Sequence, residues 1–212
     1  MAEGSYKTVR QPGADEFIEK RSRFIGSAAP VTSEKEALDF IAQKKAEYWD
    51  ANHNVYAYIL REGNIQRFSD DGEPQGTAGI PVLEVIKKGN ITDVVVVVTR
   101  YFGGILLGAG GLVRAYSHGA KIGVEAAEIK HMRPAYTVEL DTDYSLYGKI
   151  AYILPKYHIQ EQKNDFGVSV RMQFNIAAEL FERFKKELTD ITNGAIYPYI
   201  QQELYADIPL DE

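Results

Sequence analysis

Apolar residues recur along the chain with two different periods, and these periods predict its secondary structure. Alternating or continuous apolar stretches of a few residues predict strands, whereas a spacing of three to four residues predicts helices. In the first 134 residues, the pattern predicts strands at residues 17–28, 53–60, 65–68 and 94–98 and helices at residues 32–49, 77–88 and 112–129.

Local signals mark the ends of several of these elements. A Ser/Thr cap followed by Glu36 predicts the start of the first helix. Thr77 is expected to cap the second helix, and Gly89-Asn90 to end it. Gly63-Asn64 predicts a hairpin turn between two strands. The five valines at 94–98 do not alternate with polar residues, so this strand should lie centrally, covered on both faces.

From residue 136 the order of elements changes. Strand, helix, strand, strand, helix and strand are expected at residues 136–140, 144–154, 157–162, 168–174, 177–188 and 195–201. This βαββαβ order is typical of a ferredoxin-like sandwich. Pro134 is expected to close the first module. The sequence therefore predicts an α+β protein with two domains, residues 1–134 and 135–212.

Composition limits the classes of function. The 212 residues include no cysteine, which excludes disulfides, thiolate catalysis and cysteine-ligated zinc. The first residues lack the apolar segment of a signal peptide, and no apolar run approaches the roughly 20 residues that a membrane span needs. We therefore expect a cytoplasmic protein with no membrane partner.

The negative charge is unevenly distributed. The net charge is -6, yet residues 1–134 carry 17 Lys and Arg against 17 Asp and Glu, leaving 7 against 13 in residues 135–212. The neutral first part permits a local basic patch. The acidic second part either faces a protein partner or provides solubility, and the sequence does not choose between them.

A glycine-rich loop after the valine strand is the first candidate site. A strand that leads into glycines and a helix start is a common layout for anion binding, because free backbone N–H groups point at the ligand. The phosphate-loop and dinucleotide motifs do not match here, since Ala109 follows Gly108 and Val113 replaces the third glycine. Alternatively, the glycines permit close backbone packing or positive φ. The candidate residues are Arg100, Tyr101, Gly103, Gly104, Gly108, Gly110, Arg114 and Tyr116.

An acidic turn at residues 67–79 is the second candidate. Asp70, Asp71 and Glu73 lie within four positions, and their carboxylates suit a hard cation such as Mg²⁺. They equally suit an ordered turn, since Asp-Gly and Glu-Pro are typical turn sequences. A further alternative is that these acids hold Arg67, Arg100 or Arg114 in ion pairs.

The third candidate site is a basic segment at residues 20–24. Arg23 and its basic neighbours suit phosphate contacts beside Phe24, or else a solvated strand edge protected by charge. The histidines lack metal-site spacing, and His53 has no recognisable triad partners. We therefore assign no catalytic residue, metal or cofactor.

Four segments together resemble the IMPACT family, in particular its bacterial members. They are the LysArgSerArgPheIle segment from Lys20, the HisAsnValTyrAlaTyr segment from His53, the acidic turn from Arg67 and the long glycine segment from Thr99. The resemblance implies that the first domain is a two-layer α/β sandwich, similar to a ribosomal-protein domain and to domain IV of elongation factor G. It also implies a second domain similar to the ferredoxin-like domain V of that factor.

The same resemblance implies a translation-linked regulatory or binding protein. Its N-terminal domain would contact RNA or the ribosome through Arg23, Arg67, Arg100 and Arg114, with Tyr101, Tyr116 and the loop amides. The alternative is a small-molecule or nucleotide-binding enzyme that uses the glycine loop as an anion site, with Asp70 or Asp71 holding a metal.

Overall fold

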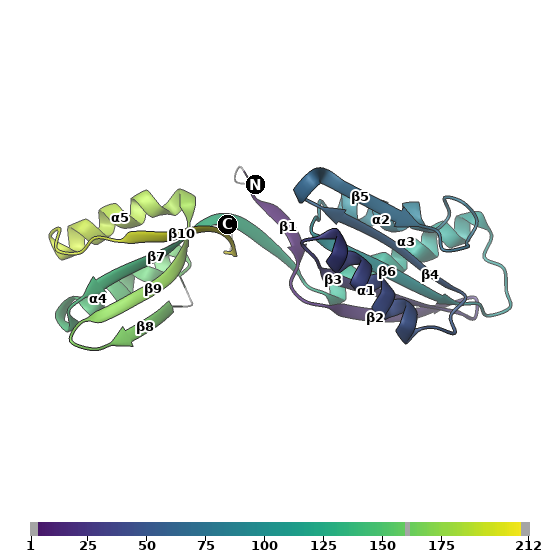
Figure 1. The fold of residues 1–212 in the computed structure, drawn as a ribbon, viewed down its shortest axis with the longest axis horizontal. Helices are drawn as coiled ribbons and strands as arrows, with labels where there is room; N and C mark the ends of the chain where they lie inside the picture. The colour runs from purple at the N-terminus through teal and green to yellow at the C-terminus, as the bar shows by residue number, and fades with distance from the viewer. Residues whose placement is uncertain (1–3, 160–161, 209–212) are drawn as a thin grey trace. The chain divides into compact units, whose positions relative to one another are not determined.

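The computed structural model describes residues 4–159 and 162–208, and these form two compact units (Figure 1). Residues 6–130 make up the N-terminal unit. The described residues from 131 onward, with Gly4 and Ser5, make up the C-terminal unit. The α+β class with two units is as predicted. The predicted domain boundary after residue 134 stays a prediction.

The N-terminal unit is built on a five-stranded sheet in the order β2-β3-β6-β4-β5, in which every neighbouring pair is antiparallel. Its elements are β1 (Tyr6–Val9), β2 (Gly13–Glu19), β3 (Ser22–Pro30), α1 (Glu34–Glu47), β4 (His53–Leu60), η1 (Glu62–Asn64), β5 (Ile65–Ser69), α2 (Gly79–Lys88), β6 (Val94–Tyr101) and α3 (Ala109–Ala126). Helices α2 and α3 cover one face of the sheet, and α1 lies against the other (Figure 1).

The central position of β6 explains its unbroken run of valines. Val94, Val96 and Val98 join the core beneath α2 and α3, whereas Val95 and Val97 pack on the α1 side. All five are fully buried. The predicted central strand, covered on both faces, is therefore confirmed, and it continues to Tyr101.

The predicted strand at 17–28 is instead the hairpin of β2 and β3. The chain reverses at Lys20 and Arg21, whose φ values are 46° and 65°. Two left-handed residues are what a tight hairpin turn requires, and Asn or Gly usually supply them. Because two basic residues adopt this conformation here, the sequence carries no ordinary turn signal. Phe17 and Phe24 face each other across the hairpin, with ring centroids 5.1 Å apart.

The first helix begins as predicted but is shorter. The Ser33 side chain accepts a hydrogen bond from the Glu36 amide, and the Glu36 carboxylate accepts one from the Thr32 amide at 2.6 Å. Two of the apolar positions that predicted this helix are not part of the core. Leu38 is exposed, and Trp49 lies beyond the end of α1 with 81% of its surface accessible.

Helix α2 is capped by a distant residue. The Thr77 hydroxyl donates to the carbonyl of Pro74, so Thr77 does not cap this helix as predicted. The Asp70 carboxylate instead accepts from the amides of Ala78 and Gly79 at 3.1 and 2.8 Å. Its position eight and nine residues earlier explains why a local capping pattern does not identify it.

Helix α3 begins earlier than predicted and ends earlier as well. Its first residue is Ala109, preceded by Gly108 in the left-handed region at φ 71°, and its last is Ala126. Its packing on β3 needs glycine on both sides, since a Cβ built on Gly26 would lie 1.8 Å from the carbonyl oxygen of Gly119.

The C-terminal unit has the strand order β8-β9-β7-β10, with every pair antiparallel. Its elements are β7 (Ile129–Thr142), α4 (Tyr144–Ile153), η2 (Leu154–Tyr157), β8 (Gln162–Phe166), β9 (Val170–Ala177), α5 (Ala178–Thr192) and β10 (Tyr199–Asp207). A βαββαβ chain with its first and third strands in the centre is the ferredoxin-like sandwich, as predicted.

Three predictions in this unit are wrong in detail. The strand expected at 195–201 is β10, which begins only at Tyr199 and continues to Asp207. Strand β7 starts at Ile129, so Pro134 lies inside it opposite Tyr205, since the fixed φ of proline is compatible with an extended backbone. The strand expected at 157–162 is not present at its start, because Tyr157 ends η2. The next strand begins at Gln162, and residues 160–161 of that prediction lie outside the described part of the chain.

Candidate functional site

A buried polar cluster lies between the sheet and α3. We call Glu73, Arg100, Tyr116 and His53 the Glu73 cluster. Arg100 donates from Nη1 to Glu73 Oε1 at 2.6 Å, and the Tyr116 hydroxyl donates to the same oxygen at 2.7 Å. His53 Nε2 lies 3.7 Å from that oxygen. One carboxylate therefore holds together residues from β4, β6, α3 and the acidic turn.

The sheet register positions this cluster. Arg100 pairs with Phe24 of β3 on one side and His53 of β4 on the other, so all three side chains share one face. The Arg100 guanidinium lies 5.5 Å from the Phe24 ring centroid and 5.4 Å from that of Phe102. Its Nη2 is 3.5 Å from the hydroxyl of Ser22. Aromatic rings and a carboxylate thus enclose the charge.

Burial limits the contact that two of the predicted site residues, Arg100 and Tyr116, can make with a ligand. Arg100 is 5% exposed and Tyr116 is fully buried. Burial, with Glu73 nearby, raises the pKa of Tyr116 above its ordinary value, because a second negative charge here would be unfavourable. The ion-pair alternative therefore describes Arg100 in this structure, and its charge is not presented to a ligand at the surface.

The other acids of the turn are engaged by the protein. Asp70 accepts from three backbone amides, those of Gly76, Ala78 and Gly79. Asp71 accepts from the Asn54 amide at 2.6 Å and from Lys45 Nζ at 2.7 Å. Across the described ranges, no three His, Cys, Asp or Glu side chains gather in a way that could hold a metal. The loop-ordering alternative accounts for these contacts.

The predicted glycines fall into different groups. A Cβ on Gly103 would lie 2.0 Å from the backbone of Arg21, so this glycine lets the loop rest on the β2–β3 turn. Gly104 and Gly108 have φ values of 83° and 71° with open space around them, and glycine is favoured there by conformation. Gly110 has neither restriction, since its nearest contact would be Arg114 Nη1 at 3.8 Å.

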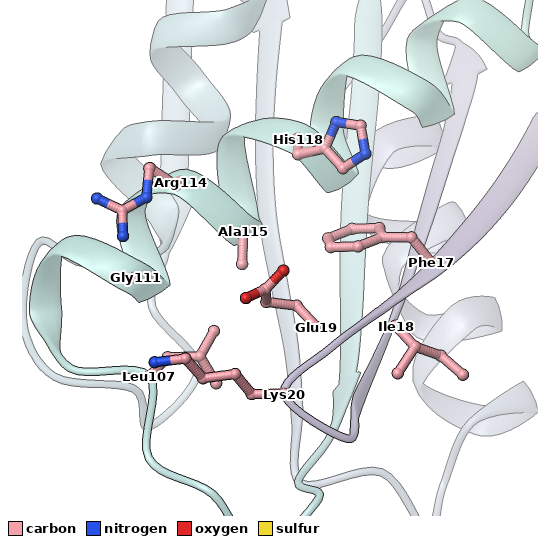
Figure 2. A pocket seen from close by; sticks show the side chains of 9 residues that line it. All are labelled: Phe17, Ile18, Glu19, Lys20, Leu107, Gly111, Arg114, Ala115 and His118. Carbon is pink, nitrogen blue, oxygen red and sulfur yellow. The ribbon is translucent and has the colours of Figure 1, made fainter.

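An open pocket of about 490 Å³ lies where α3 begins, beside the β2–β3 turn. Figure 2 shows its lining from both elements. We call it the basic pocket, and its lining residues are Phe17, Ile18, Glu19, Lys20, Leu107, Gly111, Arg114, Ala115 and His118. Lys20 and Arg114 are exposed, and among the described residues neither makes a hydrogen bond or an ion pair.

The remaining predicted residues lie outside the basic pocket. Arg23 forms an ion pair with Glu16 at 2.6 Å and lies 5.8 Å from the ring centroid of Tyr101. The Tyr101 hydroxyl donates to Asp50. Arg67 is on β5, at the edge of the sheet opposite to β2, so the structure does not bring it together with Arg114.

The sequence placed Lys20 in a basic segment suited to phosphate contacts, but it did not identify Glu19 or His118 as site residues. One signal was present for the histidine, since Gly111, Arg114, Ala115 and His118 are spaced three or four apart and share one face of α3. The turn that brings Glu19 and Lys20 to this face carries no such local signal.

Comparisons with known proteins agree with the two units. The model of the Impact N-terminal domain matches residues 20–124, and that of a domain of unknown function, DUF1949, matches residues 140–195. A crystal structure described as that of a hypothetical protein covers 93% of this chain and 98% of its own, with a TM-score of 0.58 and 29% identity. None of the helices in the described residues is long and apolar enough to span a membrane.

Curated relatives extend over most of the chain. The IMPACT family member YvyE of Bacillus subtilis is 38% identical over 90% of this chain and 88% of its own length. YigZ of Escherichia coli is 31% identical over 84% of this chain and 88% of its own. Protein IMPACT of Homo sapiens is 35% identical over only 43% of this chain. Both units match, and the match extends over 88% of each of the two bacterial relatives, so the chain belongs to the IMPACT family.

Proposed function

We propose that this chain is a translation-linked protein that binds RNA, free or within the ribosome, through its N-terminal unit. The observation that carries the proposal is the pair of basic-pocket cations, Lys20 and Arg114, that form no ion pair with any residue the structure describes. Exposed Lys and Arg side chains neutralise phosphates and release counterions, which is the main source of sequence-independent affinity for nucleic acids.

Two further features support an anionic ligand at this place. Within residues 4–159 and 162–208, no side chain caps the N-terminus of α3, so its first amides are available beside Gly111. Arg21 lies next to Lys20 and is also exposed. Arg23 and Tyr101 pair with each other on the opposite, α1 face of the sheet, so they are not part of this contact surface.

Arg100 and Tyr116 take an indirect part in this proposal. They fix the acidic turn and the end of β6 through Glu73, and the glycine loop follows directly from that strand. The link to translation rests on membership of the IMPACT family, because the resemblance of the sequence implies that role.

The test is a titration of a fluorescein-labelled single-stranded RNA with the whole chain at several salt concentrations. For single strands the logarithm of the affinity falls by about 0.7 per neutralised phosphate for each decade of salt. Replacing two phosphate contacts with the double variant Lys20→Ala, Arg114→Ala should therefore weaken binding and flatten the slope by about 1.4. Co-sedimentation with ribosomal particles should weaken in parallel.

The matched control is Lys35→Ala combined with Lys88→Ala, which removes the same charge from exposed helix positions outside the basic pocket. RNA affinity that is equal in the pocket variant and this control would contradict the proposal. So would an absence of RNA binding by the folded wild type. Binding of uridine 5′-monophosphate by a chain that does not bind RNA would instead support the small-molecule alternative.

A further inference from the structure

The basic pocket has two chemically different ends. Figure 2 shows Arg114 and Lys20 on the side where α3 begins, and Phe17 and His118 on the opposite side. The Glu19 carboxylate points into the space between them (Figure 2). A ligand that fills this pocket would therefore meet cations, then a carboxylate, then rings.

The aromatic end is held in place by packing. Phe17 is stacked on Phe24, and its ring makes an edge contact with His118 at a centroid distance of 4.5 Å. Phe24 is fully buried, so its contact holds the Phe17 ring in one position. His118 is exposed at the mouth of the pocket. Rings presented in this way contact the faces of nucleic-acid bases without selecting a sequence.

Glu19 does not fit a site for phosphate alone. Its carboxylate is exposed, and within the described part of the chain it forms no hydrogen bond or ion pair, even with Lys20 or Arg114. An ionised carboxylate only accepts hydrogen bonds and repels phosphate. A neutral hydroxyl donor beside the phosphate suits both requirements, and the ribose 2′-hydroxyl is such a donor.

We propose that the basic pocket binds one ribonucleotide unit of a single-stranded RNA. The phosphate lies at Lys20 and Arg114, the 2′-hydroxyl donates to Glu19, and the base packs against Phe17 and His118. A volume of about 490 Å³ is within the range of pockets that hold ligands of this size. This inference rests on the proposed function and adds the kind of nucleic acid that the site prefers.

The test compares two labelled probes, a short oligouridylate and the 2′-deoxy oligonucleotide with the same uracil bases. These probes differ only in the 2′-hydroxyl. The wild-type chain should bind the ribose probe about tenfold more tightly, which is the size expected for a hydrogen bond to a charged group. In Glu19→Ala this preference should fall to about one, while the deoxy probe binds at least as well as before, because a repulsive charge has been removed.

Glu16→Ala is the matched control, because it removes the same charge from the same strand outside the pocket. It should keep the ribose preference. His118→Ala should weaken both probes by a similar factor, since its ring contacts the base and not the sugar.

The outcomes separate this inference from the proposed function. RNA binding with no ribose preference, or a preference that survives in Glu19→Ala, overturns the ribonucleotide pocket and leaves RNA binding intact. A folded wild-type chain that binds neither probe overturns both.

Discussion

Arg100 and Arg114 stand at the two ends of one glycine loop and experience opposite environments. Arg100 is 5% exposed and shares Glu73 with Tyr116 and His53. Arg114 is exposed at the basic pocket, and no carboxylate among the described residues pairs with it. The same side-chain type thus stabilises the fold at one end of the loop and is available to a ligand at the other.

The difference lies in the positions of the acids. The acidic turn places Glu73 beneath β6, within reach of Arg100, whereas Glu19 beside Arg114 does not come within ion-pair distance. A buried pair offsets the desolvation of both charges only while both are present. The comparison therefore predicts that changes in the Glu73 cluster affect stability, and that changes in the basic pocket affect binding.

The largest expected effect is that of Glu73→Gln. This change keeps the size of the side chain but leaves the Arg100 guanidinium buried without its carboxylate. Removing one partner of a buried pair typically costs about 3–5 kcal/mol of unfolding free energy. Urea denaturation followed by circular dichroism measures that loss.

Two controls sharpen this result. Arg114→Gln should change the unfolding free energy by less than about 0.5 kcal/mol, as is usual for an exposed position. Combining Glu73→Gln with Arg100→Met should recover part of the loss, because the uncompensated charge is gone. A Glu73→Gln variant as stable as the wild type would show that the pair does not carry the stability assigned to it.

The sequence predicts the fold well wherever the pattern is local or the element order is distinctive. The valine strand and the βαββαβ unit belong to this group, since apolar continuity and element order follow directly from burial and connectivity. The turn at Lys20 and Arg21 was not predictable, because basic residues rarely adopt two successive positive φ values.

The candidate site was less predictable, since it depends on contacts between distant segments. The sequence identified Arg100 and Arg114 at the two ends of the glycine loop, but it did not predict that one is buried and the other exposed. Glu73 comes close to Arg100 only when β3, β6 and β4 pair in register, and Lys20 reaches Arg114 only when the β2–β3 turn packs beside α3. Neither of these two contacts produces a recognisable pattern in the sequence around the residues involved.

A smaller effect is expected from Gly103→Ala. This change tests whether the close contact between the glycine loop and the β2–β3 turn supports both stability and RNA binding. The new Cβ would lie 2.0 Å from the Arg21 backbone, so the loop and the β2–β3 turn must separate. Overpacking of this kind costs about 1–3 kcal/mol. Because Lys20 is in the same turn, RNA affinity should fall together with the unfolding free energy measured in urea.

Gly110→Ala is the matched control from the same loop and helix start. Its Cβ would meet only Arg114 Nη1 at 3.8 Å, and alanine favours a helix over glycine by up to about 1 kcal/mol. Stability should therefore be unchanged or slightly higher. Equal losses in the two variants would contradict the close approach of Gly103 to the turn.

The smallest effect is expected from Tyr116→Phe, which removes one of the two main donors to Glu73. The cost at neutral pH should be about 1 kcal/mol, because Arg100 still satisfies the carboxylate. This difference should also depend on pH. Burial raises the pKa of Tyr116 in the folded chain, whereas the unfolded tyrosine ionises near pH 10.

Above about pH 10, then, the unfolded chain loses a proton that the folded chain retains, and stability falls as pH rises. The wild type should lose more of its unfolding free energy between pH 9 and 11 than Tyr116→Phe does, so that the gap between them closes. Tyr56→Phe serves as the control, since the Tyr56 hydroxyl makes no hydrogen bond among the described residues. A gap that stays constant across this range would mean that Tyr116 ionises with the same pKa in the folded and unfolded chains, which would contradict its burial beside Glu73.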